Sequence, residues 1–383
     1  MDHGAHATTR ADGSAERELE DLVFECLERI EREGEGVVDE LCASHPSLAA
    51  TLRQRIDALR DSGLIEPSSP GGGVGLEIEG HALLECLDRA PPGSVYRSRS
   101  PDGRATLLRI VRREAFADAA ALERFERDCR AARALEHPAI VPLLEFGRSA
   151  ACSFAVAADT GETPLAEVLA RIGNRSPETL TAADLHAALS GPGTSVPVLE
   201  RGWVDLCVES IGKVAAALAF AHARGLAHGA LSTYSIEFAP DGGVRVSQWG
   251  CAELQGRAPQ LAAPAYKSPE RRAGRVHGAS VLDDVFALGM VLHEMLALRL
   301  PREERRTWLR LWRGGALHEP LSRRNACVEA ALESFVASAV DPRGSRRPRT
   351  MGEFAERLAL ARGGGVGLAP ALRGWRRWLH RAR

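Results

Sequence analysis

Lysine is almost absent from this chain of 383 residues. Only Lys213 and Lys267 occur among 49 basic residues, and all the others are arginines. The lack of a lysine at any one position is therefore weak evidence that a function has been lost. Acidic and basic residues nearly balance, with a net charge of −2, so no overall positive field argues for nucleic-acid binding. The composition, 45% hydrophobic and 26% charged, is typical of a folded globular protein.

Paired cysteine motifs and long apolar runs are missing as well. The eight cysteines are scattered with no C-x-x-C pair, which disfavours a zinc site or a disulfide framework and favours a reducing, cytosolic environment. No segment reaches the roughly 18 apolar residues that a membrane span requires. The start of the chain also lacks the apolar core of a signal peptide. These absences together predict a cytoplasmic protein.

The first 75 residues divide into three parts. Residues 1–14 are polar and are predicted to form a disordered tail. Residues 15–66 are predicted to be helical, since apolar residues such as Leu52 and Ile56 recur at helical spacing. Residues 67–75 are rich in Pro, Ser and Gly and are predicted to be a linker.

The most informative stretch runs from Leu226 to Gly250, with the sequence LAHGALSTYSIEFAPDGGVRVSQWG. Alternating apolar residues predict two short strands, separated by a tight turn at Asp241-Gly242-Gly243. The stretch resembles the catalytic loop, hairpin and metal-binding loop of protein kinases. In that family the motifs H-R-D-x-x-x-x-N and D-F-G occupy these places.

The kinase motifs keep their spacing here but change their chemistry. The resemblance implies that Ala230 replaces the catalytic aspartate, and that Ser235 and Gln248 replace the two magnesium ligands. Alanine offers no proton acceptor, serine is too short to replace the asparagine amide, and glutamine carries no charge for Mg²⁺. Gly229 replaces the arginine that usually meets an activation-loop phosphate, and no Ser or Thr lies between Gly250 and Lys267. We therefore expect no intact catalytic residues and no metal site.

The resemblance extends over most of the chain and implies an α+β, bilobal fold. A kinase-like domain is predicted over residues 76–362, with a β-rich N-lobe at 76–158 and a helical C-lobe at 159–362. Residues 173–203 are predicted to be a surface insertion containing one short helix at 182–189. The helical region before the domain resembles the leader that precedes many large bacterial kinases. The alternative is a small helical hairpin that packs on the next domain.

The resemblance also implies a degenerate nucleotide pocket. Where the family has a glycine-rich loop, Asp88 and Ala90 replace two glycines, and Pro91 and Pro92 lack the N–H groups that would bind phosphates. Leucine at position 107 adds bulk where the family has alanine, and a carboxylate at position 237 lies where an apolar residue normally supports the base. The predicted lining of this vestigial pocket comprises Gly93, Val95, Leu107, Arg109, Asp128 and Glu237.

Arg109 and Asp128 occupy the positions of the kinase lysine and glutamate that form an ion pair. A longer base and a shorter acid preserve the combined length, and an arginine can bind a carboxylate through two hydrogen bonds. Our hypothesis is that the two residues form a structural clamp between a strand and a helix. The alternative is two separate surface charges.

Residues that build the kinase fold, as distinct from its chemistry, are retained. Asp284 lies in the segment that matches the buried helix of the C-lobe, and Glu270 with Arg347 matches the family's late ion pair. In protein kinases, the side chains at these positions stabilise the fold and take no part in phosphoryl transfer. The retained structural positions are His228, Gly250, Glu270, Asp284 and Arg347.

Residues 363–383 form a glycine-rich linker followed by a basic segment that contains Trp375 and Trp378. On a helix these residues give a basic amphipathic face. Docking to a membrane surface or to an acidic partner is one interpretation, and a final helix packed on the C-lobe is the other.

The pattern of retained scaffold and lost chemistry is that of a pseudokinase. We expect a scaffold or regulatory binding module with a protein partner, such as an active kinase or its substrate, and no cofactor. The alternative is a divergent ATP-dependent serine/threonine kinase, for which ATP and Mg²⁺ would be the cofactors. For that alternative the only nearby substitute carboxylates are Glu237 and Asp241.

Overall fold

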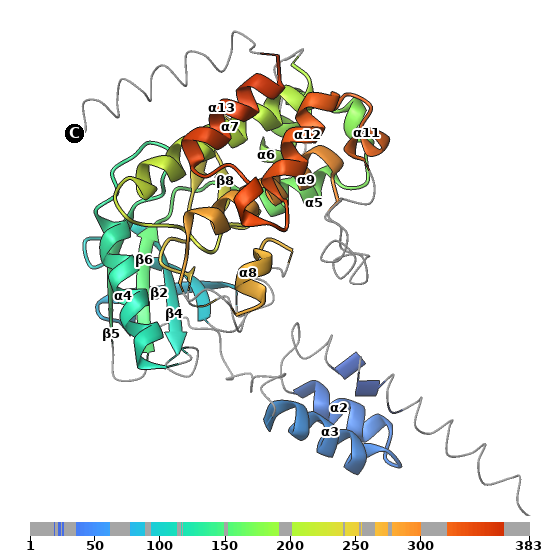
Figure 1. The fold of residues 1–383 in the computed structure, drawn as a ribbon. Helices are drawn as coiled ribbons and strands as arrows, with labels where there is room; N and C mark the ends of the chain where they lie inside the picture. Colours follow the sequence, from blue (N-terminus) through green and yellow to red (C-terminus); the bar gives the residue numbers. More distant parts are fainter. Residues whose placement is uncertain are drawn as a thin grey trace, which may run out of the picture. The chain divides into compact units, whose positions relative to one another are not determined.

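The structure is a computed structural model, and the residues that it describes fall into two compact units, within 1–74 and within 75–383 (Figure 1). The described residues are 19, 22, 23, 25, 26, 36–61, 77–88, 93–112, 116, 118–148, 152–190, 201–239, 242–252, 254, 265–274, 278–299 and 320–363.

The first unit is helical. Helix α2 spans Gly36–Ser44 and helix α3 spans Ala49–Asp61. Leu52 and Ile56, one turn apart on α3, are both fully buried. The small core that they join also contains Leu19, Leu22, Cys26, Val37, Val38, Leu41 and Cys42.

The second unit opens with a six-stranded antiparallel sheet in the order β1-β2-β3-β4-β6-β5. Strand β4 pairs with β3 on one side and with β6 on the other, so it lies inside the sheet. Because side chains alternate along a strand, Leu108 is buried on one face while Leu107 and Arg109 lie on the other. The strands are β1 Glu77–Ile78, β2 His81–Asp88, β3 Gly93–Arg99, β4 Ala105–Arg112, β5 Leu143–Arg148 and β6 Cys152–Ala158.

Helix α4, Ala119–Arg133, packs beside β5 of this sheet (Figure 1). Its first turn is capped by Asp118, whose Oδ1 accepts a hydrogen bond from the backbone N–H of Ala121 at 2.7 Å. Phe125 and Cys129 lie one turn apart and are buried, and they join the main core of the second unit. This helix therefore connects the sheet to the rest of the core.

A second, three-stranded sheet and a set of helices follow. The strands are β7 Thr163–Pro164, β8 Ile236–Phe238 and β9 Val244–Val246, in that order. The helices are α5 Leu165–Ile172, η2 Pro177–Thr179, α6 Ala182–Ser190, α7 Trp203–His222, α8 Pro269–Arg272, α9 Val281–Ala297, α11 Leu321–Arg324, α12 Ala330–Ala339, η4 Gly344–Arg346 and α13 Met351–Ala361.

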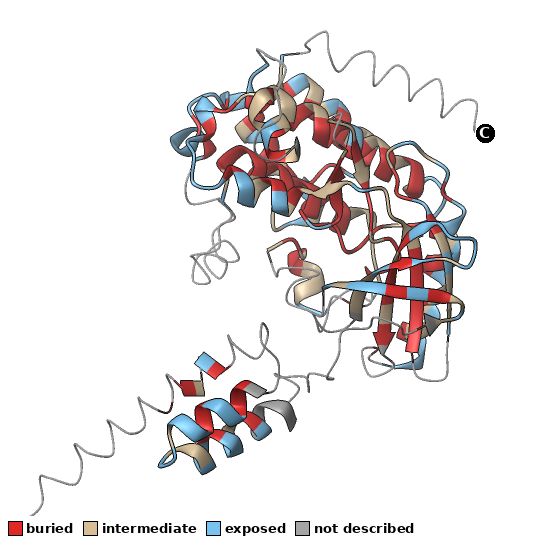
Figure 2. Ribbon diagram, turned by 180° about the vertical axis from the view of Figure 1, so that it is seen from behind, coloured by how far each residue is buried: buried red, intermediate tan, exposed pale blue. Residues whose placement is uncertain are grey.

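Helix α9 lies at the centre of the helical part and is buried over most of its surface (Figure 2). It begins with a capping box, in which Ser280 Oγ accepts from the Asp283 N–H and the Asp283 carboxylate accepts from the Ser280 N–H. Helices α7 and α12 pack against it. The Trp203 indole of α7 donates to the Met295 carbonyl of α9 at 2.7 Å, which satisfies a buried polar group.

The predicted α+β fold, with a β-rich part followed by a helical part, is confirmed. The prediction of a surface insertion at residues 173–203 needs correction. Helix α6 forms where a short helix was expected, but Leu180, Ala182 and Leu185 are buried in the main core. The described residues of this segment therefore belong to the helical part. Among the described helices, none combines the length and the apolar character needed to cross a membrane.

Candidate functional site

A cavity of about 430 Å³ lies between the two sheets of the second unit. One wall comes from the six-stranded sheet, from the faces of β3, β4 and β6 that carry Val95, Leu107 and Ala157. The opposite wall comes from β8 and from the segment that follows β9. The lining comprises Leu87, Val95, Leu107, Arg109, Val141, Leu143, Ala155, Ala157, Pro164, Tyr234, Glu237, Ser247, Gln248, Trp249 and Cys251.

The loop at residues 228–230 is fixed through its backbone. The Asp284 carboxylate accepts from the N–H groups of His228 at 2.8 Å and Gly229 at 2.7 Å, and it also contacts His222 Nε2 at 2.8 Å. Burial alone would raise the pKa of Asp284, but the hydrogen bond from His222 and the nearby histidines and N–H groups hold that pKa below its usual range. Asp284 therefore stays ionised and keeps the loop in place.

His228 continues this network toward the second loop. Burial lowers the pKa of His228, so the imidazole is neutral near pH 7. In that form Nε2–H donates to the Ser247 carbonyl at 2.8 Å, and Nδ1 accepts from the Ala230 N–H at 3.2 Å. The ring also packs against Trp249, with ring centroids 4.7 Å apart. His228 thus has a structural position between the two loops.

Gly229 lies in the left-handed region, with φ of 67°. A Cβ added there would be 2.4 Å from the Ala279 Cβ and 2.8 Å from the Ala252 Cβ, so no other residue fits without movement. The guanidinium of Arg271 lies beside this position. It donates to the Gly229 carbonyl at 2.5 Å and to the Ala252 carbonyl at 3.1 Å. Arg271 therefore joins helix α8 to both loops, a role that the sequence analysis missed.

Of the three positions where the sequence predicted lost catalytic residues, Gln248 lines the cavity, and Ala230 and Ser235 lie outside its described lining. Ala230 is buried at 1% exposure. Ser235 Oγ accepts from the Ser232 N–H at 2.9 Å and donates to the Ser232 carbonyl at 3.0 Å, so it closes its own turn. Gln248 Nε2 donates to the Tyr234 carbonyl at 3.0 Å, while its Oε1 is buried without a partner among the described residues.

The clamp expected between Arg109 and Asp128 is wrong. Asp128 Oδ1 instead accepts from the neighbouring Arg127, from Nε at 3.1 Å and from Nη2 at 3.0 Å. Arg109 is only 8% exposed and lines the cavity, and its Nη1 has no hydrogen-bond partner in the described part of the chain. The alternative of two surface charges also fails, because both residues are buried.

Glu237 is the acidic residue in the described lining. Its pKa is raised to about 7, first by burial and then by the charges of Glu162 and Asp159, against the effects of the Ser247 hydroxyl and Arg245. It shares the lining with Leu107 and Val95, the other predicted pocket residues there. Gly93 begins β3, at the end of the loop expected to bind phosphates.

Gly250 lies in the left-handed region, with φ of 81°, and a Cβ there would be 2.6 Å from Cys129 Sγ on α4. The glycine therefore allows the loop after β9 to approach α4. Burial raises the pKa of the Cys129 thiol, so this sulfur is uncharged in the contact.

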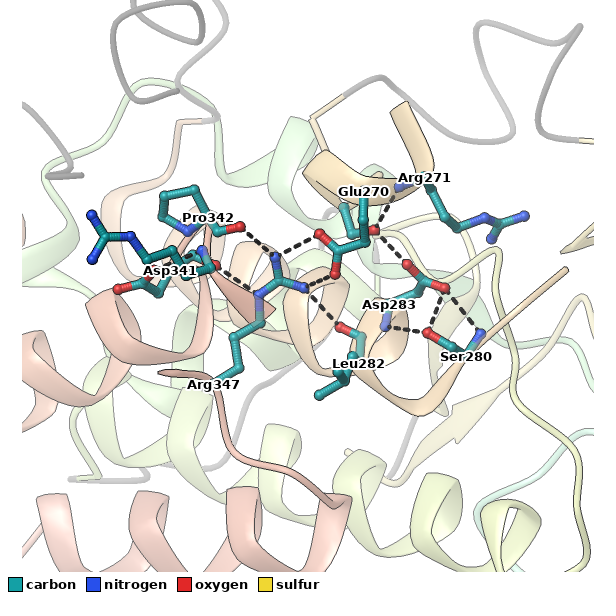
Figure 3. Close-up of polar contacts among 10 residues, drawn as sticks. Glu270, Arg271, Ser280, Leu282, Asp283, Asp341, Pro342 and Arg347 are labelled. Atoms are coloured by element: carbon teal, nitrogen blue, oxygen red, sulfur yellow. Dashed lines mark hydrogen bonds and ion pairs between the residues drawn. The ribbon is translucent and has the colours of Figure 1, made fainter. Parts of the chain in front are cut away.

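Arg347 and Glu270 form an ion pair with two hydrogen bonds, Nη1 to Oε1 at 2.6 Å and Nη2 to Oε2 at 2.9 Å (Figure 3). The Arg347 side chain is fully buried, whereas the Glu270 side chain is 23% exposed. Arg347 also donates to the Asp341 and Leu282 carbonyls and lies 4.8 Å from the Phe286 ring centroid. The pair thus joins α8 to the segment before α13.

Other predicted features lie outside the described residues. These are the loop residues Ala90, Pro91 and Pro92, the turn residue Asp241, and the tail with Trp375 and Trp378. The structure describes the backbone of Asp88 at the end of β2 but not its side chain. Within the described residues, no group of three or more His, Cys, Asp or Glu side chains could bind a metal ion.

Comparison with known proteins agrees with this geometry. The chain is 28% identical over 307 residues to the serine/threonine-protein kinase PknJ of Mycobacterium tuberculosis, which covers 76% of this chain and 47% of PknJ. It is 26% identical over 236 residues to PknA of the same organism, covering 60% of this chain and 49% of PknA. The chain thus spans about half the length of the curated relatives it matches. No protein-family model matches it.

Solved structures give the same result for the fold. The kinase domain of Mycobacterium tuberculosis PknI superposes with a TM-score of 0.55 at 20% sequence identity, over 76% of this chain and all of that domain. This chain therefore has the fold of a protein kinase domain and is a homologue of bacterial serine/threonine protein kinases.

Proposed function

We propose that the chain is a pseudokinase, a kinase-fold protein that binds a partner and does not transfer phosphoryl groups. The proposal depends on the side chains at the three catalytic positions. Phosphoryl transfer in protein kinases requires a carboxylate that accepts the substrate proton and two ligands that hold Mg²⁺. Ala230, Ser235 and Gln248 supply no carboxylate. The Ser235 hydroxyl is used to close its own turn, and Gln248, whose Nε2 donates to the Tyr234 carbonyl, has only a neutral amide oxygen to offer a metal ion.

The contact made by Arg271 supports the same proposal. In the family, this region is controlled by an arginine and an activation-loop phosphate, and here a glycine occupies the position of that arginine. Arg271 donates to backbone carbonyls of both loops and needs no phosphate to do so. A segment held in this way suits a constitutive binding surface. We propose a protein partner, such as an active kinase or its substrate.

A divergent ATP-dependent serine/threonine kinase is the second candidate. Two observations favour it: the homologues are named as kinases, and a cavity of about 430 Å³ with Arg109 and Glu237 in its lining persists. With a pKa of about 7, Glu237 is the described carboxylate that could exchange a proton near neutral pH. A substitute base of this kind would have to act without the usual metal ligands.

Thermal unfolding with ATP, with and without Mg²⁺ or Mn²⁺, separates the two candidates. A ligand that binds only the folded chain must raise its stability by mass action. We expect no metal-dependent rise of the melting temperature at millimolar ATP, and no phosphate incorporation into the chain or into a basic protein substrate. A clear metal-dependent rise accompanied by incorporation would overturn the proposal and favour the divergent kinase.

A further inference from the structure

The cavity between the two sheets contains a cation, Arg109, that has no counter-ion among the residues that the structure describes. Arg109 is 8% exposed, it lines the cavity, and neither Asp128 nor any other described acidic side chain forms an ion pair with it. Its Nη1 has no hydrogen-bond partner among the described residues. A buried guanidinium without a partner is strongly unfavourable, so this site favours an anion supplied from outside the chain.

The rest of the lining is mostly apolar. Leu87, Val95, Leu107, Val141 and Leu143 surround the space, together with Ala155 and Ala157. A volume of about 430 Å³ falls within the usual range of small-molecule sites, roughly 300–1,000 Å³. The ligand that fits is therefore a small apolar body with one anionic group.

Two features favour a carboxylate over a phosphate as that group. Arg109 is the single cationic residue in the described lining, and its planar fork of N–H groups matches the two oxygens of one carboxylate. Glu237 shares the lining, so a second negative charge on the ligand would be repelled whenever Glu237 is ionised. A monoanion therefore suits the site better than a phosphate dianion.

We propose that the cavity binds a small apolar carboxylic acid, whose carboxylate pairs with Arg109 and whose apolar body contacts Leu107 and Val95, without a metal ion. This goes beyond the proposed loss of phosphoryl transfer and assigns the old nucleotide position a different ligand. Binding gives Arg109 Nη1 the hydrogen-bond partner that it lacks among the described residues, and it removes the apolar body from water.

Calorimetric titration of the full chain with matched probes tests the proposal. The probes are naphthoate, the uncharged naphthamide of the same shape, and naphthyl phosphate, all in buffer containing a chelator. We expect naphthoate to bind about tenfold or more tightly than naphthamide, since a charged hydrogen bond contributes on this scale. Naphthyl phosphate should bind more weakly than naphthoate.

Variants at position 109 show whether the arginine is responsible. Arg109→Met should reduce naphthoate affinity to that of naphthamide, and Arg109→Lys should give an intermediate affinity because the charge remains but the planar fork is lost. Arg99→Met is the matched control, since Arg99 is exposed on the adjacent strand and outside the lining. It should leave the affinity unchanged.

Several results would overturn the inference. They are equal binding of naphthoate and naphthamide, tighter binding of naphthyl phosphate, unchanged naphthoate affinity in Arg109→Met, or no binding of any probe at millimolar concentration. None of these results affects the proposed loss of phosphoryl transfer, because phosphate incorporation is measured separately and does not use these probes.

Discussion

Arg347 and Glu270 differ in solvent exposure. This difference predicts that replacing one side chain or the other will lower the free energy of unfolding by unequal amounts. Glu270→Ala leaves a fully buried guanidinium without its counter-ion, and we expect the free energy of unfolding to fall by about 3–5 kcal/mol. Arg347→Met leaves a carboxylate that water reaches, so we expect a smaller loss. Chemical denaturation of both variants measures the difference.

An exposed ion pair provides the control. Glu167 pairs with Arg171 at 2.5 Å on the surface of α5, and Glu167→Ala should lower the free energy of unfolding by at most about 1 kcal/mol. If Glu270→Ala unfolds like Glu167→Ala, the pair does not stabilise the C-lobe as described.

Glu237 makes stability depend on pH. Its pKa rises from the usual 4.5 to about 7 in the folded chain, so the folded state keeps a proton that the unfolded state releases. The contribution of Glu237 to the free energy of unfolding is most favourable below pH 4.5. It falls as the pH rises from 4.5 to about 7, and it stays constant at higher pH. Removing the charge by Glu237→Gln should stabilise the chain at pH 8, by up to about 3 kcal/mol.

Unfolding curves at two pH values test this prediction. Glu237→Gln and the unmodified chain should have nearly equal stability at about pH 4.5 and should diverge above pH 7. A difference that is the same at both values would mean that the substitution acts through packing, and that Glu237 does not carry the proton.

At the scale of elements, Gly229 lets three segments meet: the loop after α7, the segment around Ala252, and helix α8. Gly229→Arg would restore the arginine of the kinase motif, yet its Cβ would overlap Ala279 and Ala252, and φ of 67° is unfavourable for it. We expect a loss of at least about 3 kcal/mol in the free energy of unfolding, which combines backbone strain with steric overlap.

A variant at Gly225 separates the backbone strain from the steric overlap. It also lies in the left-handed region, with φ of 79°, but a Cβ there would meet nothing within 4 Å. Gly225→Ala should therefore cost about 1 kcal/mol, the backbone part alone. Equal losses for Gly225→Ala and Gly229→Ala, measured by thermal unfolding, would contradict the close packing described at position 229.

The elements of this fold were predictable because each has a local signal. Helix α7, Trp203–His222, has such a signal, because its apolar periodicity and the glycine that follows it at position 225 both belong to the local sequence. The contacts of buried polar groups were harder to predict. Arg109 and Asp128 occupy the positions of the paired lysine and glutamate of protein kinases, so they were expected to face each other. Arg127, adjacent to Asp128, binds that carboxylate instead.

The role of Arg271 had no signal in the sequence. Its acceptors are backbone carbonyls, which every residue has, so no pairing of residue types could reveal them. The ion pair of Glu270 with Arg347 was different, because both partners are side chains at positions that the kinase resemblance marks. Helix α6 was placed correctly by its pattern, but its burial depends on neighbours far away in the chain.

For the molecule as a whole, the proposed loss of phosphoryl transfer predicts that restoring the family residues at the three catalytic positions will not by itself produce kinase activity. The variant with Ala230→Asp, Ser235→Asn and Gln248→Asp regains the base and the metal ligands. Catalysis of phosphoryl transfer nevertheless depends on a nucleotide held in position. Leu107 and Glu237 still line the cavity, and the sequence between β2 and β3 still contains two prolines.

Autophosphorylation with radiolabelled ATP and Mg²⁺ is the measurement, and circular dichroism shows that the variant is folded. A second variant that also carries Leu107→Ala and Glu237→Leu tests whether the pocket is the remaining obstacle. Measurable autophosphorylation by the triple variant alone would mean that the nucleotide site is intact.

The way in which Asp284 holds the loop has an evolutionary consequence. Its carboxylate accepts from the backbone N–H groups of residues 228 and 229, which every residue except proline has. Substitutions in this loop can therefore accumulate without releasing it, provided that each new side chain fits its neighbours. Mutational tolerance of this kind allows a lineage to lose an activity one residue at a time while every intermediate still folds.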